Sequence, residues 1–187
     1  MTKVVSRLRT KYKKDLIPKL MQDLGIKNVM QVPKIDKIVV NVGMGSFLAG
    51  SKDYSQVENT LLGITGQRPV LRKARLSVSN FKLREGMPVG MVVTLRGDRA
   101  YDFLDKIINV VYPRVRGFQG VKRNIFDRDG NASFGFKEHN VFPEVSLEDI
   151  NKTHGIQVTV VTSTKNQDHS RKLMEALEFP FRKPNNQ

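Results

Sequence analysis

Strand-like apolar segments follow one another in this chain with no helix between them, and this ordering constrains the fold more than any other feature. The segment RPVLRK (68–73) precedes VGMVVTLRG (89–97), and the hairpin-like FDRDGNASFGF (126–136) precedes GIQVTVVTST (155–164). Parallel neighbours would need a crossover helix between the strands of each pair. The ordering predicts an α+β fold: a single domain over 1–187, with a mostly antiparallel sheet and helices packed on one face.

The N-terminal part is expected to form a helix followed by the first strand. Apolar residues recur every four positions from Leu8 to Leu24, which is typical of one face of a helix. We expect Pro18 to kink this helix and Gly25 to end it. The first strand is expected over 35–42.

Three further helices complete the predicted order α-β-α-β-β-α-β-β-α. One should span 51–66, with a capping box at Ser55–Glu58. The next should have Asp98 as its cap and Pro113 at its end. The last should cover 168–179 and be followed by a short C-terminal tail.

Basic residues strongly outnumber acidic ones. The 187 residues include 32 Lys and Arg but only 18 Asp and Glu, which gives a formal net charge of +14. This excess favours a polyanionic partner, because each cation placed beside a phosphate releases a condensed counterion. A generally basic enzyme is the alternative.

Several classes of site lack the residues that they need. Without cysteine there is no disulfide, thiolate zinc site or cysteine nucleophile. The N-terminal segment has no signal-peptide core, and no apolar run is long enough to span a membrane. We therefore expect a cytoplasmic protein with no cofactor and no membrane partner.

The segment NVGMGSFLAGSK comes nearest to a nucleotide-binding motif. Leu48 stands where a dinucleotide fingerprint needs its third glycine, and Lys52 comes one place too late after Gly50 for a P-loop. We interpret the segment as a turn where a partner can approach the backbone closely. A basic nucleotide-binding protein or enzyme that uses the Gly43–Lys52 loop is the alternative.

The three histidines give no support to a metal or catalytic site. His139, His154 and His169 lie in separate segments without metal-ligand spacing, and are expected to be lone surface histidines. No serine–histidine–aspartate arrangement stands out. We predict no catalytic residue and no metal site.

A basic segment without acids runs from Arg68 to Arg84. Phe81 and Leu83 lie among its cations, and an exposed aromatic ring can stack on an unpaired base. The connection over 74–86 is too long for a simple hairpin, which predicts a functional projection that contacts RNA. The cations of the segment are Arg68, Arg72, Lys73, Arg75, Lys82 and Arg84.

The segment KEHNVFPEVSLEDINKTHG has the opposite character. It is locally acidic and partly apolar, which makes it a poor RNA surface. A surface for a basic protein partner and a solvated loop are both consistent with it.

Several long motifs resemble a known family. They are MQVPKIDKIVVNVGMG, GITGQRPVLRKARLSVSNFKLREGMPVGMVVTLRGDRAYDFLDK, PRVRGFQG, GNASFGFKEHNVFPE and FPFRK, and together they cover nearly the whole chain in order. They resemble the bacterial large-subunit ribosomal protein L-five family. The resemblance implies a ribosome-bound structural protein that helps attach 5S ribosomal RNA in the central protuberance.

The resemblance also implies partners and contact residues. The partners would be 5S ribosomal RNA, transfer RNA in the peptidyl site, large-subunit ribosomal RNA with the neighbouring 5S-binding proteins, and small-subunit protein thirteen. For 5S RNA it implies Asn41, Gly43, Gly45, Gln67, Arg68, Thr94 and Arg96. For transfer RNA it implies Arg75, Ser77, Ser79, Phe81, Lys82 and Arg84. For the bridge to the small subunit it implies Glu138, Glu144, Glu148 and Asp149.

Overall fold

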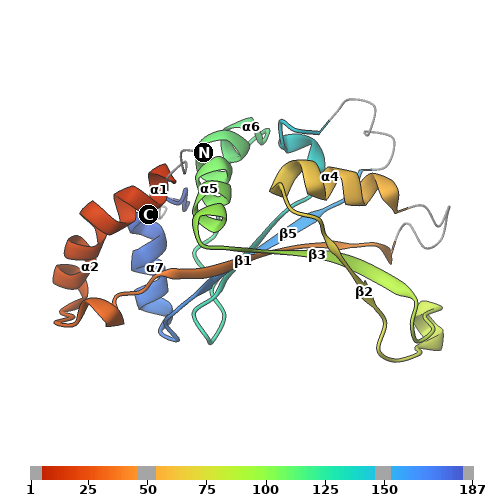
Figure 1. Cartoon of the computed structure of the whole chain (residues 1–187), viewed down its shortest axis with the longest axis horizontal. Coiled ribbons are helices and arrows are strands. Elements are labelled where there is room, and N and C mark those ends of the chain that lie inside the picture. The colour runs from red at the N-terminus through yellow and green to blue at the C-terminus, as the bar shows by residue number, and fades with distance from the viewer. Residues whose placement is uncertain (1–5, 46–53, 146–152, 183–187) are drawn as a thin grey trace, which may run out of the picture. The chain divides into compact units, whose positions relative to one another are not determined.

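The computed structural model describes residues 6–45, 54–145 and 153–182, and their elements follow the predicted order (Figure 1). The helices are α1 (Arg7–Lys11), α2 (Ile17–Leu24), α4 (Ser55–Thr65), α5 (Asp98–Lys106), α6 (Tyr112–Arg114) and α7 (Gln167–Ala176). The strands are β1 (Ile35–Gly43), β2 (Val70–Lys73), β3 (Pro88–Arg96), β4 (Ala132–Phe136) and β5 (Ile156–Thr162). Short π-helical segments are η1 (Tyr12–Leu16) and η4 (Ile107–Val111), and 3₁₀ turns are η2 (Val29–Gln31), η3 (Ser79–Phe81) and η5 (His139–Val141).

The strands form one five-stranded sheet in the order β2-β3-β1-β5-β4. β2 pairs antiparallel with β3, with Val70 opposite Val92, and the register shifts between Arg72 and Lys73. Buried and less buried residues alternate along β1, β3 and β5, as expected for strands with one face on the core. The predicted α+β class is confirmed.

Chain contacts divide the protein into two compact units, each assembled from separate segments. Unit 1 comprises 1–38, 95–134 and 159–187, and unit 2 comprises 39–94 and 135–158. In each unit, helices cover one face of the strands (Figure 1). The assignment of 1–187 to a single domain stays a prediction.

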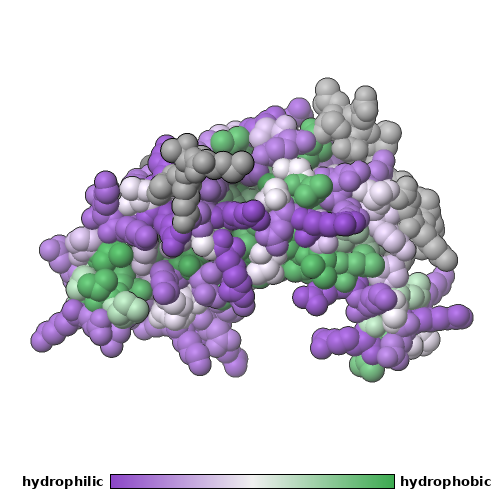
Figure 2. Space-filling view, in the orientation of Figure 1, coloured by the Kyte–Doolittle hydropathy of each residue, from purple (hydrophilic) through white to green (hydrophobic). Residues whose placement is uncertain are grey.

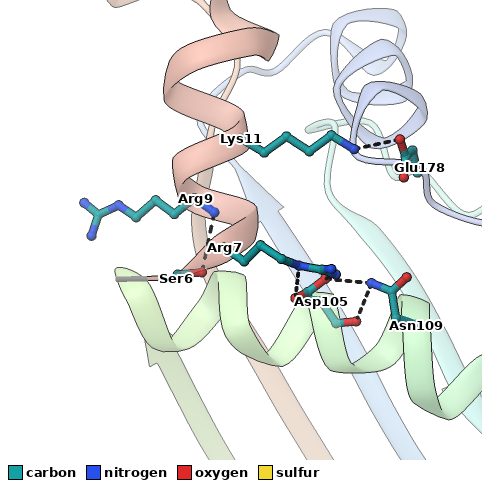
Figure 3. A network of polar contacts seen from close by, with 7 residues as sticks. All are labelled: Ser6, Arg7, Arg9, Lys11, Asp105, Asn109 and Glu178. Carbon is teal, nitrogen blue, oxygen red and sulfur yellow. Dashed lines mark hydrogen bonds and ion pairs between the residues drawn. The ribbon is translucent and has the colours of Figure 1, made fainter. Parts of the chain in front are cut away.

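The first helix of unit 1 buries the predicted apolar stripe. Leu8, Leu16 and Leu20 are buried, and Gly25 ends the helix in the left-handed conformation at φ 64°. Ion pairs hold the helix in place (Figure 3): Arg7 contacts Asp105 of α5 at 2.8 Å, and Lys11 contacts Glu178 at 2.7 Å.

Two prolines each lie two residues after the end of a π-helical turn. η1 precedes Pro18 and η4 precedes Pro113, and each proline stands at the start of a new α-helical segment. Leu16 and Val111 are helical, so each proline lies inside a continuing helix. Proline cannot donate the backbone hydrogen bond of a regular helix, and an irregular π-helical turn precedes it in both cases. The helix ends at Arg114, one residue beyond the expected end at Pro113.

Two predicted caps are also corrected. Tyr54 and Gly97 hold the N-cap positions of α4 and α5, and neither helix has a side-chain cap hydrogen bond from its N-cap residue. Ser55 and Asp98 are the first residues inside their helices. The Asp98 carboxylate instead accepts a hydrogen bond from the Arg9 guanidinium of α1.

The predicted hairpin turn and the start of the predicted C-terminal tail are both seen in the structure. The turn forms: Gly130 N–H donates to the Asp127 carbonyl at 3.1 Å, and Phe126 bridges Ala132. The described part of the tail, up to Arg182, packs on the protein: Phe179 is 4% exposed and Phe181 bridges Val121 in parallel.

Unit 2 packs α4 over its strands (Figure 1). The helix buries Val57, Leu61 and Ile64. The strands bury Val40 on β1 and Val93 on β3. Polar residues between these buried positions therefore lie on the opposite face of the sheet.

Candidate nucleic-acid interface

Three of the predicted contact residues gather around β1 and β3 in unit 2. Asn41 follows the buried Val40 on β1, and Thr94 follows the buried Val93 on β3. Because side chains alternate along a strand, both point away from the core, and both are half-buried. Gln67 lies just after the end of α4 and is half-buried as well.

Gln67 is fixed against β3. Its Nε2 donates a hydrogen bond to the Thr94 carbonyl at 3.2 Å, and its backbone N–H donates to the Thr65 hydroxyl at 3.3 Å. The amide is thereby held beside Thr94, with one donor already engaged inside the protein. The sequence did not reveal this link, because Gln67 and Thr94 are separated by all of β2 and the following loop.

Gly90 keeps the space beside Asn41 open. A Cβ atom at this position would lie 3.0 Å from the Val42 carbonyl oxygen and 3.7 Å from Asn41 Oδ1. Any side chain would crowd β1 at the point where Asn41 is presented. The sequence does not mark this role of Gly90, because the approach of two strands leaves no local signal.

The predicted glycine turn is open. A Cβ added at Gly43 or Gly45 would meet no atom within 4 Å, and neither residue has a positive φ. The fold of the described chain therefore does not require glycine at either position. The rest of the predicted turn, including Leu48 and Lys52, lies outside the described residues.

Both predicted phosphate-binding arginines carry a surface ion pair. Arg68 Nε lies 2.8 Å from Glu58 Oε1 in unit 2, and its side chain is 82% exposed. In unit 1, Arg96 Nη1 lies 3.5 Å from Asp36 Oδ2. Exposed pairs contribute only about 0–1 kcal/mol, so a phosphate could replace either carboxylate at small cost.

The connection between β2 and β3 is an ordered projection. Ala74 N–H donates to the Met87 carbonyl at 2.8 Å, and Gly86 N–H donates to the Ala74 carbonyl at 3.0 Å. Further out, Val78 and Leu83 exchange backbone hydrogen bonds across η3. We call residues 74–86 the basic hairpin.

The surface around the basic hairpin mixes hydrophilic and hydrophobic side chains (Figure 2). Phe81 is 76% exposed and Leu76 is 75% exposed. The Ser77 hydroxyl accepts a hydrogen bond from Glu85 N–H at 2.9 Å, so it also helps to fold the hairpin. Exposed residues predicted to contact RNA are Arg75, Ser77, Ser79, Phe81, Lys82 and Arg84.

The acidic stretch is described only in part. Glu138 and Glu144 are exposed, whereas Glu148 and Asp149 lie outside the described residues. The expectation of surface histidines is wrong for two of the three. His139 and His154 are buried, and their rings stack with centroids 4.1 Å apart.

Comparison with known proteins decides the family. Residues 28–84 match the family model of ribosomal protein L5, and residues 88–181 match the model of the C-terminus of the same ribosomal family. The large ribosomal subunit protein uL5 of Caldanaerobacter subterraneus subsp. tengcongensis is 46% identical over 179 residues, covering 96% of this chain and 100% of the relative. The uL5 protein of Chloroflexus aggregans is 48% identical over 176 residues, covering 94% and 98%.

The chain belongs to the ribosomal protein L5 family. It is a structural constituent of the large ribosomal subunit and binds RNA as part of the ribosome. The basic enzyme considered as an alternative is thereby set aside, because members of this family are structural and not enzymatic.

Two features are absent from the described residues. Within 6–45, 54–145 and 153–182, no group of three or more His, Cys, Asp or Glu side chains could hold a metal ion. In the same part of the chain, no helix is both long and apolar enough to cross a membrane.

Proposed function

We propose that Asn41, Gln67 and Thr94 form the face that binds 5S ribosomal RNA and helps attach it in the central protuberance. The observation that carries this proposal is the hydrogen bond from Gln67 Nε2 to the Thr94 carbonyl. It holds the Gln67 amide beside Thr94, and both residues are half-buried. Gly90 keeps the neighbouring Asn41 accessible.

The chemistry of this face suits RNA. Asn, Gln and Thr side chains are neutral and both donate and accept hydrogen bonds, so they can contact ribose 2′-hydroxyls and base edges. Arg68 and Arg96 supply charge, and Gly43 and Gly45 leave backbone open to a phosphate or sugar. Neighbouring 5S-binding proteins and large-subunit RNA complete the surroundings.

The basic hairpin supports a second contact, with transfer RNA in the peptidyl site. It projects exposed Arg75, Lys82 and Arg84 and carries Phe81 at its tip. Contacts with phosphates and sugars carry affinity without reading bases, which suits a ribosome that must accept every transfer RNA.

The exposed acids support a contact with a basic small-subunit protein. Glu138 and Glu144 lie on the surface next to η5. Together with Glu148 and Asp149, they would face small-subunit protein thirteen across the subunit interface. Complementary charge favours such a partner over RNA.

The 5S proposal is tested by filter binding of purified 5S RNA. The variants Asn41→Ala and Thr94→Ala should each weaken binding by about 1–3 kcal/mol, because an RNA group loses its partner in a desolvated contact. Asn59→Ala is the matched control, since Asn59 is exposed on α4, in the same unit but on the other layer. Wild-type affinity in both test variants would refute the assigned face.

A further inference from the structure

A second group of basic side chains lies in unit 1, in a segment that the proposed contacts do not use. No acidic residue occurs between Asp105 and Asp127, although the segment from Arg114 to Arg123 contains four cations. All four of these cations are exposed, namely Arg114, Arg116, Lys122 and Arg123.

The end of the described chain is held beside this segment. Val121 N–H donates to the Pro180 carbonyl at 2.9 Å, and Arg182 N–H donates to the Val121 carbonyl at 2.9 Å. The residues around Val121 and Phe181 therefore run in parallel, which places Arg182 next to Lys122. A fifth cation joins the group through backbone pairing of segments that are distant in sequence.

The close approach of these two segments requires glycine at position 120. Gly120 has a φ of +92°, and an added Cβ would lie 2.6 Å from both the Cα and the N of Arg182. A side chain there would force the segments apart. The pairing is therefore built into the backbone.

Aromatic packing fixes the other end of the segment. The Phe118 ring stacks on Tyr112 with centroids 4.6 Å apart, and Tyr112 meets Phe179 edge-on at 5.5 Å. Tyr112 is 5% exposed and Phe179 is 4% exposed, so the stack is anchored in the core. The cations between Tyr112 and Lys122 thus stand on a backbone held at both ends.

Most of these cations have no acidic partner within the protein. Arg123 lies 3.4 Å from Glu175 of α7. Among the described residues, no carboxylate lies within ion-pair distance of the other four. We call these four, Arg114, Arg116, Lys122 and Arg182, the basic platform.

We propose that the basic platform is a second RNA-binding surface, which holds the phosphate backbone of double-stranded RNA without reading sequence. The side chains around the cations, such as Gln119 and Asn124, are polar and exposed. Protein–protein interfaces usually have an apolar centre. A patch of exposed guanidinium groups instead matches phosphate oxygens directly, which favours RNA. The inference rests on membership of a ribosomal family and not on the 5S assignment.

The test is binding of the full chain to a short RNA duplex of arbitrary sequence over a series of salt concentrations. The test variant is Arg114→Gln, Arg116→Gln, Lys122→Gln. The control variant is Lys13→Gln, Lys19→Gln, Lys165→Gln, which removes the same charge from exposed residues scattered over unit 1. Thermal unfolding of each variant checks that it is folded.

The platform variant should bind the duplex more weakly. In a plot of log affinity against log salt concentration, its slope should be shallower by about two, because each of the three removed cations contributes roughly 0.7–0.9 per phosphate contact. The scattered variant should change the slope by less than about one. Equal slopes for the two variants would show an effect of net charge alone and would overturn the proposal. If the platform variant keeps duplex binding but loses binding of a polyglutamate peptide, the RNA proposal is overturned in favour of an acidic protein partner.

The same measurements separate this proposal from the 5S proposal. Asn41→Ala should lower 5S binding and leave duplex binding at the wild-type value. The platform variant should lower duplex binding whether or not the sheet face binds 5S RNA. Failure of one proposal therefore leaves the other standing.

Discussion

The imidazole rings of His139 and His154 stack with centroids 4.1 Å apart and an angle of 10° between their planes. The His154 backbone N–H also donates to His139 Nδ1 at 3.3 Å. His139 is 0% exposed and His154 is 6% exposed, so the pair is part of the core of unit 2. It joins η5 to the start of the segment that leads into β5.

The stack predicts a measurable energetic coupling. His139→Ala and His154→Ala should each destabilise the protein by about 2–4 kcal/mol, because each removes a buried ring. The double variant should cost about 0.5–1.5 kcal/mol less than the sum of the single variants. Urea unfolding measures these values, with half-buried His169→Ala as the control. Strict additivity would show that the stack contributes nothing of its own.

Substitution of Gly120 should create a backbone clash that the same substitution at Gly25 avoids. Gly120→Ala should destabilise the protein by more than Gly25→Ala, because both have positive φ but only Gly120 approaches another backbone at 2.6 Å. Left-handed strain alone costs roughly 1–2 kcal/mol. We expect Gly25→Ala to lose about that amount, and Gly120→Ala to lose at least about 1 kcal/mol more, by thermal unfolding. Equal losses would mean that the two segments separate without cost.

Asp127 should make the stability that the turn before β4 contributes to the fold depend on pH. The side-chain hydrogen bond from Asn131, with backbone hydrogen bonds from Asn131 and Asp129, lowers the pKa of the Asp127 carboxyl below its usual value. Because the pKa is lower in the folded state, the contribution is present above the unfolded pKa and is lost as the pH falls through the folded pKa.

The corresponding measurement compares Asp127→Ala with the wild type across pH. Because the carboxylate is exposed, the variant should lose only about 0.5–1 kcal/mol at neutral pH. The difference should shrink as the pH falls below the unfolded pKa of 3.8. Asp129→Ala in the same turn is the control and should show a smaller loss at neutral pH. A difference that persists in acid would point to a cause other than the carboxylate.

Shortening the basic hairpin should leave the fold intact and weaken the contact with peptidyl-site transfer RNA. Joining Arg75 directly to Glu85 removes exposed residues and retains the hydrogen bonds between Ala74, Gly86 and Met87 at the base. Stability and 5S binding should stay near wild type, since exposed residues contribute little to the core. Ribosomes with this deletion should release peptidyl-site transfer RNA faster in a filter-binding dissociation assay.

Point variants control for the length of that deletion. Lys82→Gln with Arg84→Gln removes two charges and keeps the backbone, so it should speed release as well, to a smaller extent. Lys13→Gln with Lys19→Gln removes the same charge elsewhere and should leave release unchanged. Retention equal to wild type in the deletion variant would refute the transfer RNA contact.

Much of the fold follows from local patterns in the sequence. The alternation of Val40, Asn41 and Val42 places Asn41 on the outer face of β1, and the stripe from Leu8 to Leu20 forms the buried side of the first helix. Element order, the stop at Gly25 and the exposure of the basic hairpin follow in the same way. Each of these features depends on residues within a few positions of one another. Hydrophobic periodicity and turn residues therefore predict it directly from the sequence.

Contacts between distant segments were decided only by the tertiary structure. Gln67 meets Thr94, His139 stacks on His154, and Arg182 lies beside Gly120, although no local pattern marks any of these pairs. The sequence alone led to surface histidines, whereas His139 and His154 are buried. The physical reason is that amphipathic elements specify which face is buried, whereas the choice of neighbour depends on how all the faces pack together.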